Sequence, residues 1–492
     1  MSTGDDYVSE FIINRRYLGT YYPIENSVNK ISLFYPSLHY YLLQSFAPKA
    51  YRRFGLILNL TYDAIAGLVV FYFSLNFFKA SPIGGMSSAE AGLSVLALFY
   101  LSPLLLPMHA RIMGLKSRPM GSVIALTFFL ALYEQTINPS YLCYGLLVLI
   151  VCLSIISSQI SFQSIFFITL PLVIFSDAYE VLLIFPLSFI LVLLLFKVNM
   201  YNYFCVKIEH FKWYANTLDT TMIRNRGLLR SFLRVFSDRR DLISGIKFLV
   251  SNNSVVIAAT SFPLVFFAIY EVVINASPLV QTAPELLFFI YAGLAIFIIT
   301  SIRPFVVAGE AERYLEAIAP FIIIWAVQQV SNGSYLSEYI LLSMIIQVSF
   351  IILNFILSQD STFRRSFSDA PSIEKEFAEV LSVLQKISSK MPFGVAFGPA
   401  KISFLAGSLL SSNPNIKILY SSGFDNNFSM SWAQEAFPSY LHLRVPFSFY
   451  KERYSVNFIV LSSYLLRHES YLNEAKKYKL IFKNNKYVVL QI

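Results

Sequence analysis

The feature that most constrains this chain is a series of ten apolar runs separated by polar segments. A helix that crosses a hydrocarbon core of about 30 Å needs about 20 predominantly apolar residues. The runs lie at 56–78, 91–108, 120–135, 139–157, 162–176, 178–197, 253–274, 284–307, 314–330 and 338–358. Those at 120–135 and 162–176 are short for a span, so we expect them to tilt little, to be re-entrant or to be extended by their polar flanks. The pattern predicts about ten membrane helices.

The composition agrees with a membrane protein that crosses the bilayer many times. Of the 492 residues, 56% are hydrophobic and 14% are charged, and a chain this apolar is not expected to form a soluble globule. The three cysteines (Cys143, Cys152 and Cys205) have no paired spacing, which argues against a disulfide framework and against a cysteine metal site. We therefore expect an all-α bundle in the cell membrane.

The net charge of +9 is not spread evenly along the chain. Basic residues cluster at the ends of the apolar runs and in one long polar loop at 198–252, where we expect them to meet membrane lipid rather than nucleic acid. In this loop the apolar residues between 228 and 236 predict an amphipathic helix lying on the membrane. The positive-inside rule would place a basic loop in the cytoplasm, although the rule holds best for short loops.

The character of the sequence changes after residue 358. Residues 376–492 alternate a helical pattern at 377–387 with β-rich runs at 394–397, 416–420, 458–461 and 487–490. Helices that alternate with strands predict a small α/β domain. The chain is thus expected to have three parts: an acidic loop with a juxtamembrane helix at 1–54, the membrane bundle at 55–360, and the α/β domain at 361–492.

Two adjacent carboxylates, Asp5 and Asp6, precede the first apolar run. Aromatic residues follow them at near-helical spacing, and an amphipathic helix opened by Pro36 then leads toward the bundle. A carboxylate pair on an ordered loop beside a membrane is suited to acid and base chemistry on a lipid-borne substrate. The alternative is a solvated and disordered terminus, which is usual for the first residues of a chain.

Two basic clusters are candidates for binding a phosphate. Arg303 and Arg313 flank a polar turn that contains Glu312, and a guanidinium fork matches the oxygens of a phosphate or pyrophosphate. The alternative is an arginine–glutamate pair that only closes the turn. Arg118 lies in a basic turn that opens a helix, where the alternative role is anchoring at the membrane surface. No group of Asp, Glu and His residues has the spacing of metal ligands, so we expect neither a metal nor another cofactor.

Five acidic residues are expected close to the ends of the spans. They are Asp63, Glu134, Asp177, Glu180 and Glu271. An ionised side chain at the middle of a membrane costs about 2.5–3.5 kcal/mol on insertion scales. Anchoring at the interface would explain acids in such positions, whereas a proton or ion relay would need several of them at the membrane midplane.

The order of these features resembles the GT-C superfamily of integral-membrane glycosyltransferases, which includes protein O-mannosyltransferases and the aminoarabinose transferases of lipid A. Its members have an acidic motif on the first extracytoplasmic loop, then a helix with a Tyr/Pro motif, and an Arg–Tyr turn near a late span. The counterparts here are Asp5-Asp6, Tyr35-Pro36-Ser37-Leu38-His39 and Glu312-Arg313-Tyr314-Leu315. The resemblance covers residues 4–360 and lies in the layout rather than in one motif.

The resemblance also implies a topology. Members carry a transmembrane helix ahead of the acidic loop, whereas this sequence begins four residues ahead of Asp5, so either a first helix precedes Met1 or the chain lacks it. With that helix the bundle would have about 10–11 transmembrane helices. Counting spans in this way, in preference to the positive-inside rule, places 198–252, 308–313 and the α/β domain outside the cytoplasm.

The reaction implied by the resemblance is transfer of a sugar from a polyprenyl-phosphate donor to a glycan, lipid or protein acceptor, by inverting displacement. In this hypothesis Asp5 is the general base and Asp6 orients the acceptor. Arg313 neutralises the donor phosphate with help from Arg303 or from a basic residue of the long loop. The other residues assigned to the site are Glu312, Tyr314, Tyr35, His39 and Arg118.

Two other functions stay open at this point. A transporter or lipid flippase would use Asp177 and Glu180 as coupling acids, but such proteins usually carry internal repeats, which the hydropathy pattern does not show. A non-catalytic membrane scaffold would only display the α/β domain. A transferase forms a new bond and a transporter does not, so analysis of the product separates these functions.

Overall fold

The computed structural model describes residues 8–9, 11–13, 21–34, 38–46, 51–102, 117–196, 200–217, 249, 253–271, 284–302, 305, 308–331, 336–358, 375–438 and 442–492. The chain divides into two compact units. The bundle unit comprises Gly55–Lys197 and Ile223–Phe363, and the α/β unit comprises Met1–Phe54, Val198–Met222 and Arg364–Ile492. The α/β unit therefore combines three separate segments of the sequence.

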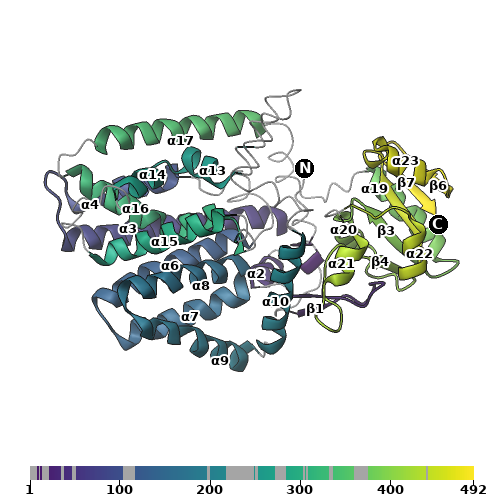
Figure 1. Cartoon of the computed structure of the whole chain (residues 1–492), viewed down its shortest axis with the longest axis horizontal. Helices are drawn as coiled ribbons and strands as arrows, with labels where there is room; N and C mark the ends of the chain where they lie inside the picture. The colour runs from purple at the N-terminus through teal and green to yellow at the C-terminus, as the bar shows by residue number, and fades with distance from the viewer. Residues whose placement is uncertain are drawn as a thin grey trace. The chain divides into compact units, whose positions relative to one another are not determined.

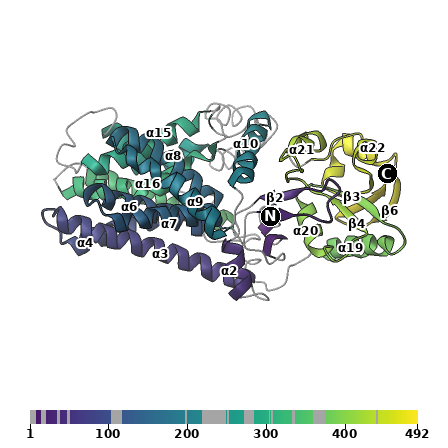
Figure 2. The ribbon, with the colours of Figure 1, turned by 90° about the horizontal axis from the view of Figure 1, so that it is seen from below.

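The bundle unit consists of helices that lie lengthwise beside one another (Figure 1, Figure 2). They are α3 (Tyr51–Ala80), α4 (Ser88–Leu101), α6 (Arg118–Ile137), α7 (Tyr141–Ser157), α8 (Gln159–Ser176), α9 (Ile184–Phe196), α13 (Ser254–Ser261), α14 (Leu264–Ile269), α15 (Pro284–Ser301), α16 (Ala311–Ser331) and α17 (Leu336–Ser358). Among the described residues, four helices are long and apolar enough to cross a membrane: Phe54–Ala80, Arg118–Ile137, Gln159–Ser176 and Pro284–Ser301. The predicted fold class, a helical membrane bundle with a small α/β domain, is confirmed.

Most helices begin and end within a few residues of the predicted spans. The two short runs are extended by their polar flanks, because α6 begins at Arg118 and α8 begins at Gln159. The run at 178–197 begins with the short 3₁₀ helix η1 (Tyr179–Leu183) before α9. Hydrophobic length alone therefore located the helices well, but it placed the starts of α6 and α8 two or three residues too far inside.

One predicted span, at 253–274, is interrupted. Pro263 separates α13 from α14, because proline lacks the N–H that a continuous helix needs. Two side chains of α17 form hydrogen bonds with backbone oxygens at this break. Tyr339 donates to the oxygen of Pro263 (3.0 Å), and Gln347 donates to the oxygen of Ser261 (3.2 Å). Backbone groups released inside a membrane must be satisfied by protein, since lipid offers no partner.

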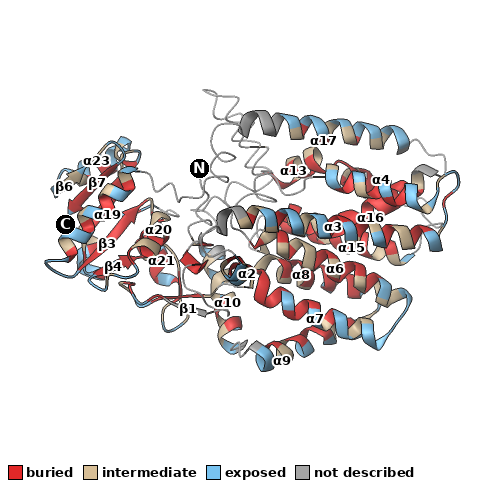
Figure 3. Ribbon diagram, turned by 180° about the vertical axis from the view of Figure 1, so that it is seen from behind, coloured by how far each residue is buried: buried red, intermediate tan, exposed pale blue. Residues whose placement is uncertain are grey.

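The central helix of the bundle is α16. It packs against α4, α6, α8, α13, α14, α15 and α17, and every residue of Phe321–Ala326 is fully buried. Phe321 stacks on Phe289 of α15 with ring centroids 4.6 Å apart, and Tyr133 of α6 contacts Phe289 at 5.8 Å. Figure 3 shows this contrast, with α16 largely buried and α17 carrying a long exposed face. The surrounding helices therefore hold α16, and with it the polar residues at its first turn.

The α/β unit contains a five-stranded sheet in the order β4-β3-β5-β7-β6. Its strands are β3 (Phe393–Gly398), β4 (Ile416–Leu419), β5 (Val456–Ser462), β6 (Lys479–Lys483) and β7 (Tyr487–Gln491). β4, β3 and β5 are parallel, and β5, β7 and β6 are antiparallel. The helices are α19 (Lys375–Ser388), α20 (Ile402–Leu409), α21 (Ser431–Ala436), α22 (Ser448–Tyr454) and α23 (Glu469–Ala475). The four predicted strands and the helix predicted at 377–387 are confirmed; β6, a largely exposed edge strand, was not predicted.

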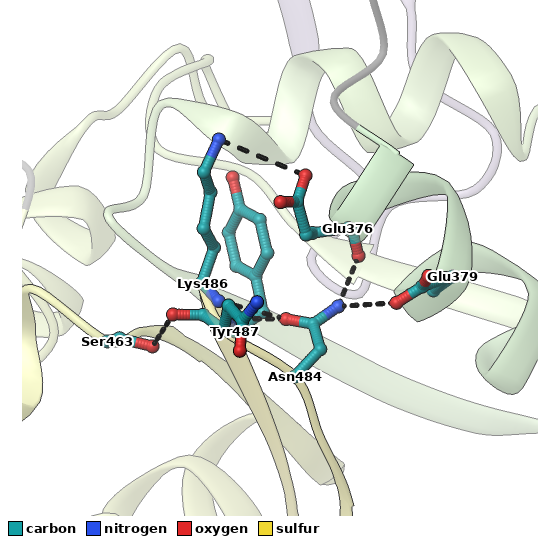
Figure 4. A network of polar contacts seen from close by, with 7 residues as sticks. Glu376, Glu379, Ser463, Asn484, Lys486 and Tyr487 are labelled. Carbon is teal, nitrogen blue, oxygen red and sulfur yellow. Dashed lines mark hydrogen bonds and ion pairs between the residues drawn. The ribbon is translucent and has the colours of Figure 1, made fainter.

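The turn between β6 and β7 is fastened to α19 by polar contacts (Figure 4). Asn484 donates from its side-chain amide to the backbone oxygen of Glu376 (2.8 Å) and to the carboxylate of Glu379 (3.0 Å). The amide oxygen of Asn484 accepts the backbone N–H groups of Lys486 and Tyr487. The side chain of Asn484 thus forms hydrogen bonds with both the turn and α19, and these bonds hold α19 beside the antiparallel part of the sheet.

The N-terminal segment is part of the same unit. β1 (Tyr21–Pro23) and β2 (Ser32–Phe34) form an antiparallel hairpin, and α2 (Leu38–Phe46) follows. Ile418 donates its N–H to the oxygen of Asn26 (2.8 Å) and accepts the N–H of Val28 (3.0 Å). Ser32 and Phe424 exchange two backbone hydrogen bonds of 2.8 Å. Met1–Phe54 and Arg364–Ile492 both contribute to the α/β unit, although the sequence suggested two separate parts, 1–54 and 361–492.

The polar loop predicted at 198–252 begins with a helix, α10 (Met200–Thr217), which also belongs to the α/β unit. Val206 of α10 packs in a buried cluster with Phe424 and Met430. The membrane-lying helix predicted between 228 and 236 falls outside the described residues. A segment between two predicted spans therefore contributes to the core of a unit formed largely by the C-terminal residues.

Replacing Tyr420 by phenylalanine is expected to loosen the N-terminal hairpin from the α/β unit. The buried Tyr420 hydroxyl donates to the amide oxygen of Asn26 at 2.7 Å, and a buried acceptor that loses its donor costs about 1–3 kcal/mol. Hydrogen exchange of residues 21–34 in the full chain should speed up accordingly. Tyr464→Phe, at an exposed position, is the matched control, and equal exchange in both variants would contradict the prediction.

Acid is expected to destabilise the region around α23 through Glu474, whose side chain is almost fully buried. Burial raises the pKa of Glu474, but hydrogen bonds from Lys477, the Phe447 N–H and Tyr478 outweigh it and hold the pKa below its ordinary value. A depressed pKa gives a stabilisation that is complete at neutral pH and disappears as the pH falls from about 4.5 through the folded-state pKa.

The measurement is hydrogen exchange of residues 443–478 between pH 7 and pH 3, with the wild type compared with Glu474→Gln at each pH so that intrinsic exchange rates cancel. The difference between the two proteins should be largest at neutral pH and should shrink toward pH 3. A difference that does not change with pH would assign the stabilisation to groups other than the Glu474 carboxylate.

Candidate functional site

The bundle unit brings together charged residues that lie far apart in the sequence. Glu310, just before α16, lies between Arg118 at the start of α6 and Arg313 in the first turn of α16. The Nη1 atom of Arg118 is 3.8 Å from the Glu310 carboxylate, and Nε of Arg313 contacts the same carboxylate oxygen. The three side chains are 11%, 23% and 21% exposed for Arg118, Arg313 and Glu310. Two guanidinium groups therefore converge on one carboxylate in a mostly buried site.

Local structure explains why these groups meet. Gly309 has a backbone φ of +127°, which residues other than glycine rarely adopt, and the chain turns into α16 at this residue. The hydroxyl of Tyr314 donates to the oxygen of Ala308 (2.5 Å) and so fastens this turn from inside the helix. Tyr314 is itself buried and contacts Phe167 of α8 edge to face. The turn thus presents Glu310 and Arg313 at a defined place beside α6.

The guanidinium of Arg118 is not fully satisfied by these partners. Its Nε atom is buried, and no hydrogen-bond acceptor for it lies among the described residues. Its distance of 3.8 Å to Glu310 is an ion pair rather than a close hydrogen bond. A buried N–H of a cation without an acceptor is costly, which makes this group a natural partner for a bound anion.

Further carboxylates lie around the two arginines. Glu312 is buried, and Glu316 follows one helical turn later; both interact electrostatically with Arg118. Glu316 and Asp63 of α3 line a small pocket of about 20 Å³, which is the size of one water molecule. The other lining residues are Ala66, Phe99, Pro119, Ser122, Val123 and Leu126. In the described part of this site, carboxylates balance the guanidinium groups.

The remaining predicted site residues fall in two groups. Asp5, Asp6, Tyr35 and Arg303 lie outside the described residues. His39 lies in α2 of the α/β unit, where it is fully buried and its ring packs edge to face on Tyr40. Burial lowers the pKa of His39 to about 3, so its imidazole is neutral at physiological pH and cannot act as a cation toward a phosphate.

The acidic residues near the span ends are not equivalent. Asp177 and Glu180 are exposed at the turn between α8 and η1, with Asp177 in the left-handed conformation that ends α8. Glu134 is exposed in the last turn of α6. Asp63 instead lies well inside α3, which begins at Tyr51, and lines the pocket beside the arginines. The two acids that a transporter would use for coupling are therefore exposed at a helix end, whereas Asp63 is half-buried and Glu271, which follows α14, is buried.

Helix direction places the arginine site at one particular end of the bundle. Gly121 of α6 lies against Ser158, so α6 begins beside the connection from α7 to α8. α8 then runs away from this end, and η1 and α9 return to it beside α7. In the same way α17 packs on α16 and, following it through a short connection, returns to the end where α16 begins. α9 and α17 therefore both end at the end of the bundle that carries Arg118 and Arg313.

Sequence reasoning found Arg118 and Arg313 separately but missed Glu310 as the group that joins them. Their pairing is a tertiary contact, and the only local signal was the crowding of charged residues in Gly309–Glu316. In the described residues no group of three or more His, Cys, Asp or Glu side chains is placed to hold a metal ion. The described site is thus built from guanidinium and carboxylate groups.

No protein-family model matches the chain, and no curated protein matches it in sequence. The fold resembles that of the archaeal oligosaccharyltransferase AglB from Archaeoglobus fulgidus, solved in complex with an inhibitory peptide and a dolichol-phosphate. That comparison covers 96% of this chain and 67% of the other, with 12% identity and a TM-score of 0.50. The apo form of the Archaeoglobus fulgidus oligosaccharyltransferase gives the same coverages, 11% identity and a TM-score of 0.47. This likeness to the first of the two structures confirms the expected resemblance at the level of fold.

Proposed function

We propose that the chain is a membrane glycosyltransferase that moves a sugar from a polyprenyl-phosphate donor to an extracytoplasmic acceptor, which is a glycan, a lipid or a protein. The observation that carries the proposal is the buried guanidinium of Arg118, whose Nε has no acceptor among the described residues and which shares Glu310 with Arg313. A carboxylate held by two arginines occupies a place suited to a phosphate, since both anions accept hydrogen bonds from a guanidinium fork. The GT-C fold supports the same class of donor.

In this mechanism the donor enters from the bilayer and its phosphate displaces Glu310 from Arg118 and Arg313. Arg303 assists, and Glu312 and Tyr314 shape the turn that holds Arg313. As the bond from the anomeric carbon to the phosphate oxygen breaks, the electron pair stays on the polyprenyl phosphate. The two guanidinium groups stabilise the charge that develops there, which is the kind of electrostatic stabilisation that lowers a barrier most.

A carboxylate of the N-terminal loop activates the acceptor by removing a proton from it. Asp5 takes the proton of an acceptor hydroxyl, whose oxygen then forms the new bond to the anomeric carbon with inversion, while Asp6 orients the acceptor. Tyr35 lines this side of the site in the proposal, whereas His39, which is fully buried in α2, is not part of its lining. The loop lies outside the cytoplasm in this proposal, together with the C-terminal domain, and Asn26 and Tyr420 tie the segment that follows it to that domain.

The test uses the purified full chain in liposomes with radiolabelled polyprenyl-phosphate sugars and a panel of hydroxyl-bearing acceptors. Label that becomes covalently attached to an acceptor supports a transferase, and a sugar phosphate without the lipid serves as the control donor. Label that crosses the bilayer without a new bond would instead identify a transporter. If every donor remains unchanged and in place, the proposed function is wrong and the scaffold alternative gains support.

Replacing Glu310 by glutamine is expected to lower the KM for the donor by about three- to tenfold, because the phosphate no longer competes with a carboxylate for Arg118 and Arg313. The kinetics are measured with the purified variant after thermal unfolding has shown that it is folded. Glu435→Gln removes an exposed ion pair with Arg453 in the α/β unit and is the matched control. A higher KM in a stably folded Glu310 variant would argue for a role limited to closing the turn.

A further inference from the structure

Helix α10 presents two different apolar faces. On one face Val206 is buried in the cluster with Phe424 and Met430, and Trp213 packs against the same cluster. On the opposite face Tyr201, Phe204 and Ile208 are 73%, 41% and 54% exposed. Their spacing of three and four residues places them on one side of the helix. A soluble helix normally exposes polar residues on the face turned away from its core, so this second apolar face needs a partner.

The position of α10 in the chain identifies that partner. α9 ends at Phe196 and α10 begins at Met200, and four residue steps of extended chain reach at most about 14 Å. α9 itself is a strongly apolar helix whose last turn exposes Leu193, Leu194 and Leu195. The start of α10 therefore cannot leave the neighbourhood of the membrane surface at which α9 ends.

The exposed face of α10 also changes character along its length. Its first half carries Tyr201, Phe204 and Ile208, whereas the exposed residues among the described side chains of its second half are Lys212, Ala215 and Asn216. Aromatic residues are enriched at membrane–water interfaces, and a lysine beyond them can extend its ammonium group to water. The polarity thus increases with distance from α9, as it does across the headgroup region of a bilayer.

We propose that the first two turns of α10 lie in the headgroup region of the bilayer through Tyr201, Phe204 and Ile208, while the opposite face of the helix holds the α/β unit. The partner of this surface is the lipid bilayer itself. Because Val206 and Trp213 pack against residues of the C-terminal segment, α10 anchors that segment to the membrane by a contact additional to its covalent link after α17. This inference does not depend on the proposed transferase activity.

The experiment measures the depth of single spin labels in the full chain reconstituted in lipid nanodiscs. Serine replaces Cys143, Cys152 and Cys205, and single cysteines at 204 and 208 then carry a nitroxide. Serine can keep the hydrogen bonds that Cys143 and Cys152 donate to backbone oxygens. A label at Leu194 on α9 is the lipid reference, and a label at Asn216 near the end of α10 is the water reference.

Labels at 204 and 208 are expected to be relaxed more by oxygen than by a water-soluble nickel complex, as the label at 194 is. Labels that follow the pattern of 216 would place this face in water and overturn the proposal. Low accessibility to both reagents would also overturn it, because the face would then be covered by another segment of this chain or by a second copy.

Discussion

Replacing Asp5 by asparagine is expected to lower the rate of sugar transfer by about 10²- to 10⁴-fold, the range typical for loss of a general base. Asparagine has nearly the same shape as aspartate but cannot take a proton, so binding of donor and acceptor should change little. The measurement is kcat for label transfer from a polyprenyl-phosphate donor in liposomes. The loss should appear in kcat rather than in the KM for the donor.

Asp6→Asn is the matched control, since it removes a carboxylate from the neighbouring position. If Asp6 only orients the acceptor, its loss should raise the KM for the acceptor and reduce kcat much less than Asp5→Asn does. Equal and small effects of both substitutions would exclude this carboxylate pair as the source of the base. Hydrogen exchange of residues 21–34 checks that the hairpin after the loop stays in place.

Replacing Arg313 by glutamine is expected to reduce kcat/KM for the donor by about 10- to 100-fold. A hydrogen bond to a charged group contributes about 1.5–3 kcal/mol, and each 1.4 kcal/mol is a factor of ten. Arg313 contacts Glu310 in the first turn of the buried helix α16, so it can pass from that carboxylate to a phosphate without a change of fold. The measurement is steady-state kinetics with a varied concentration of the lipid donor.

The direction in which the two substitutions change donor binding shows whether Arg313 binds the phosphate or only forms a structural ion pair with Glu310. A phosphate-binding Arg313 requires that Arg313→Gln weakens donor binding while Glu310→Gln strengthens it. If the pair is purely structural, both substitutions destabilise the fold, and donor binding should weaken in both variants. Arg453→Gln, which removes an exposed arginine from its pair with Glu435, controls for loss of positive charge, and Arg313→Lys tests the geometry of the fork.

The sequence was informative wherever the pattern is local. Runs of apolar residues located the membrane helices, and short β-rich runs located four of the five strands of the C-terminal sheet. The edge strand β6 was not found because it carries lysine at both ends and is mostly exposed, as an edge strand is expected to be. Helix α10 was taken for a polar loop, although the spacing of Tyr201, Phe204 and Ile208 is helical.

What the sequence could not reveal are the contacts between distant segments. The arginines of the site were recognised one by one, but that Glu310 draws Arg118 and Arg313 together depends on the packing of α6 against α16. The bonds of Asn26 and Ser32 to Ile418 and Phe424 are backbone pairings, for which no side-chain pattern gives a signal. The position of Asp63 well inside α3 could not be predicted, because the helix begins at Tyr51, ahead of the apolar run at 56–78.

The three-segment construction of the α/β unit sets the order of events during synthesis. Asn26 and Ser32 leave the ribosome before α3, but their backbone partners Ile418 and Phe424 are made only after α17. The entropic cost of closing so long a loop grows only with the logarithm of its length, so the delay is one of timing rather than of stability. A nascent chain halted after α17 would hold its helices in the bilayer without an assembled α/β unit. Any activity that needs the assembled α/β unit is therefore expected only after the strands that follow α17 have been translated.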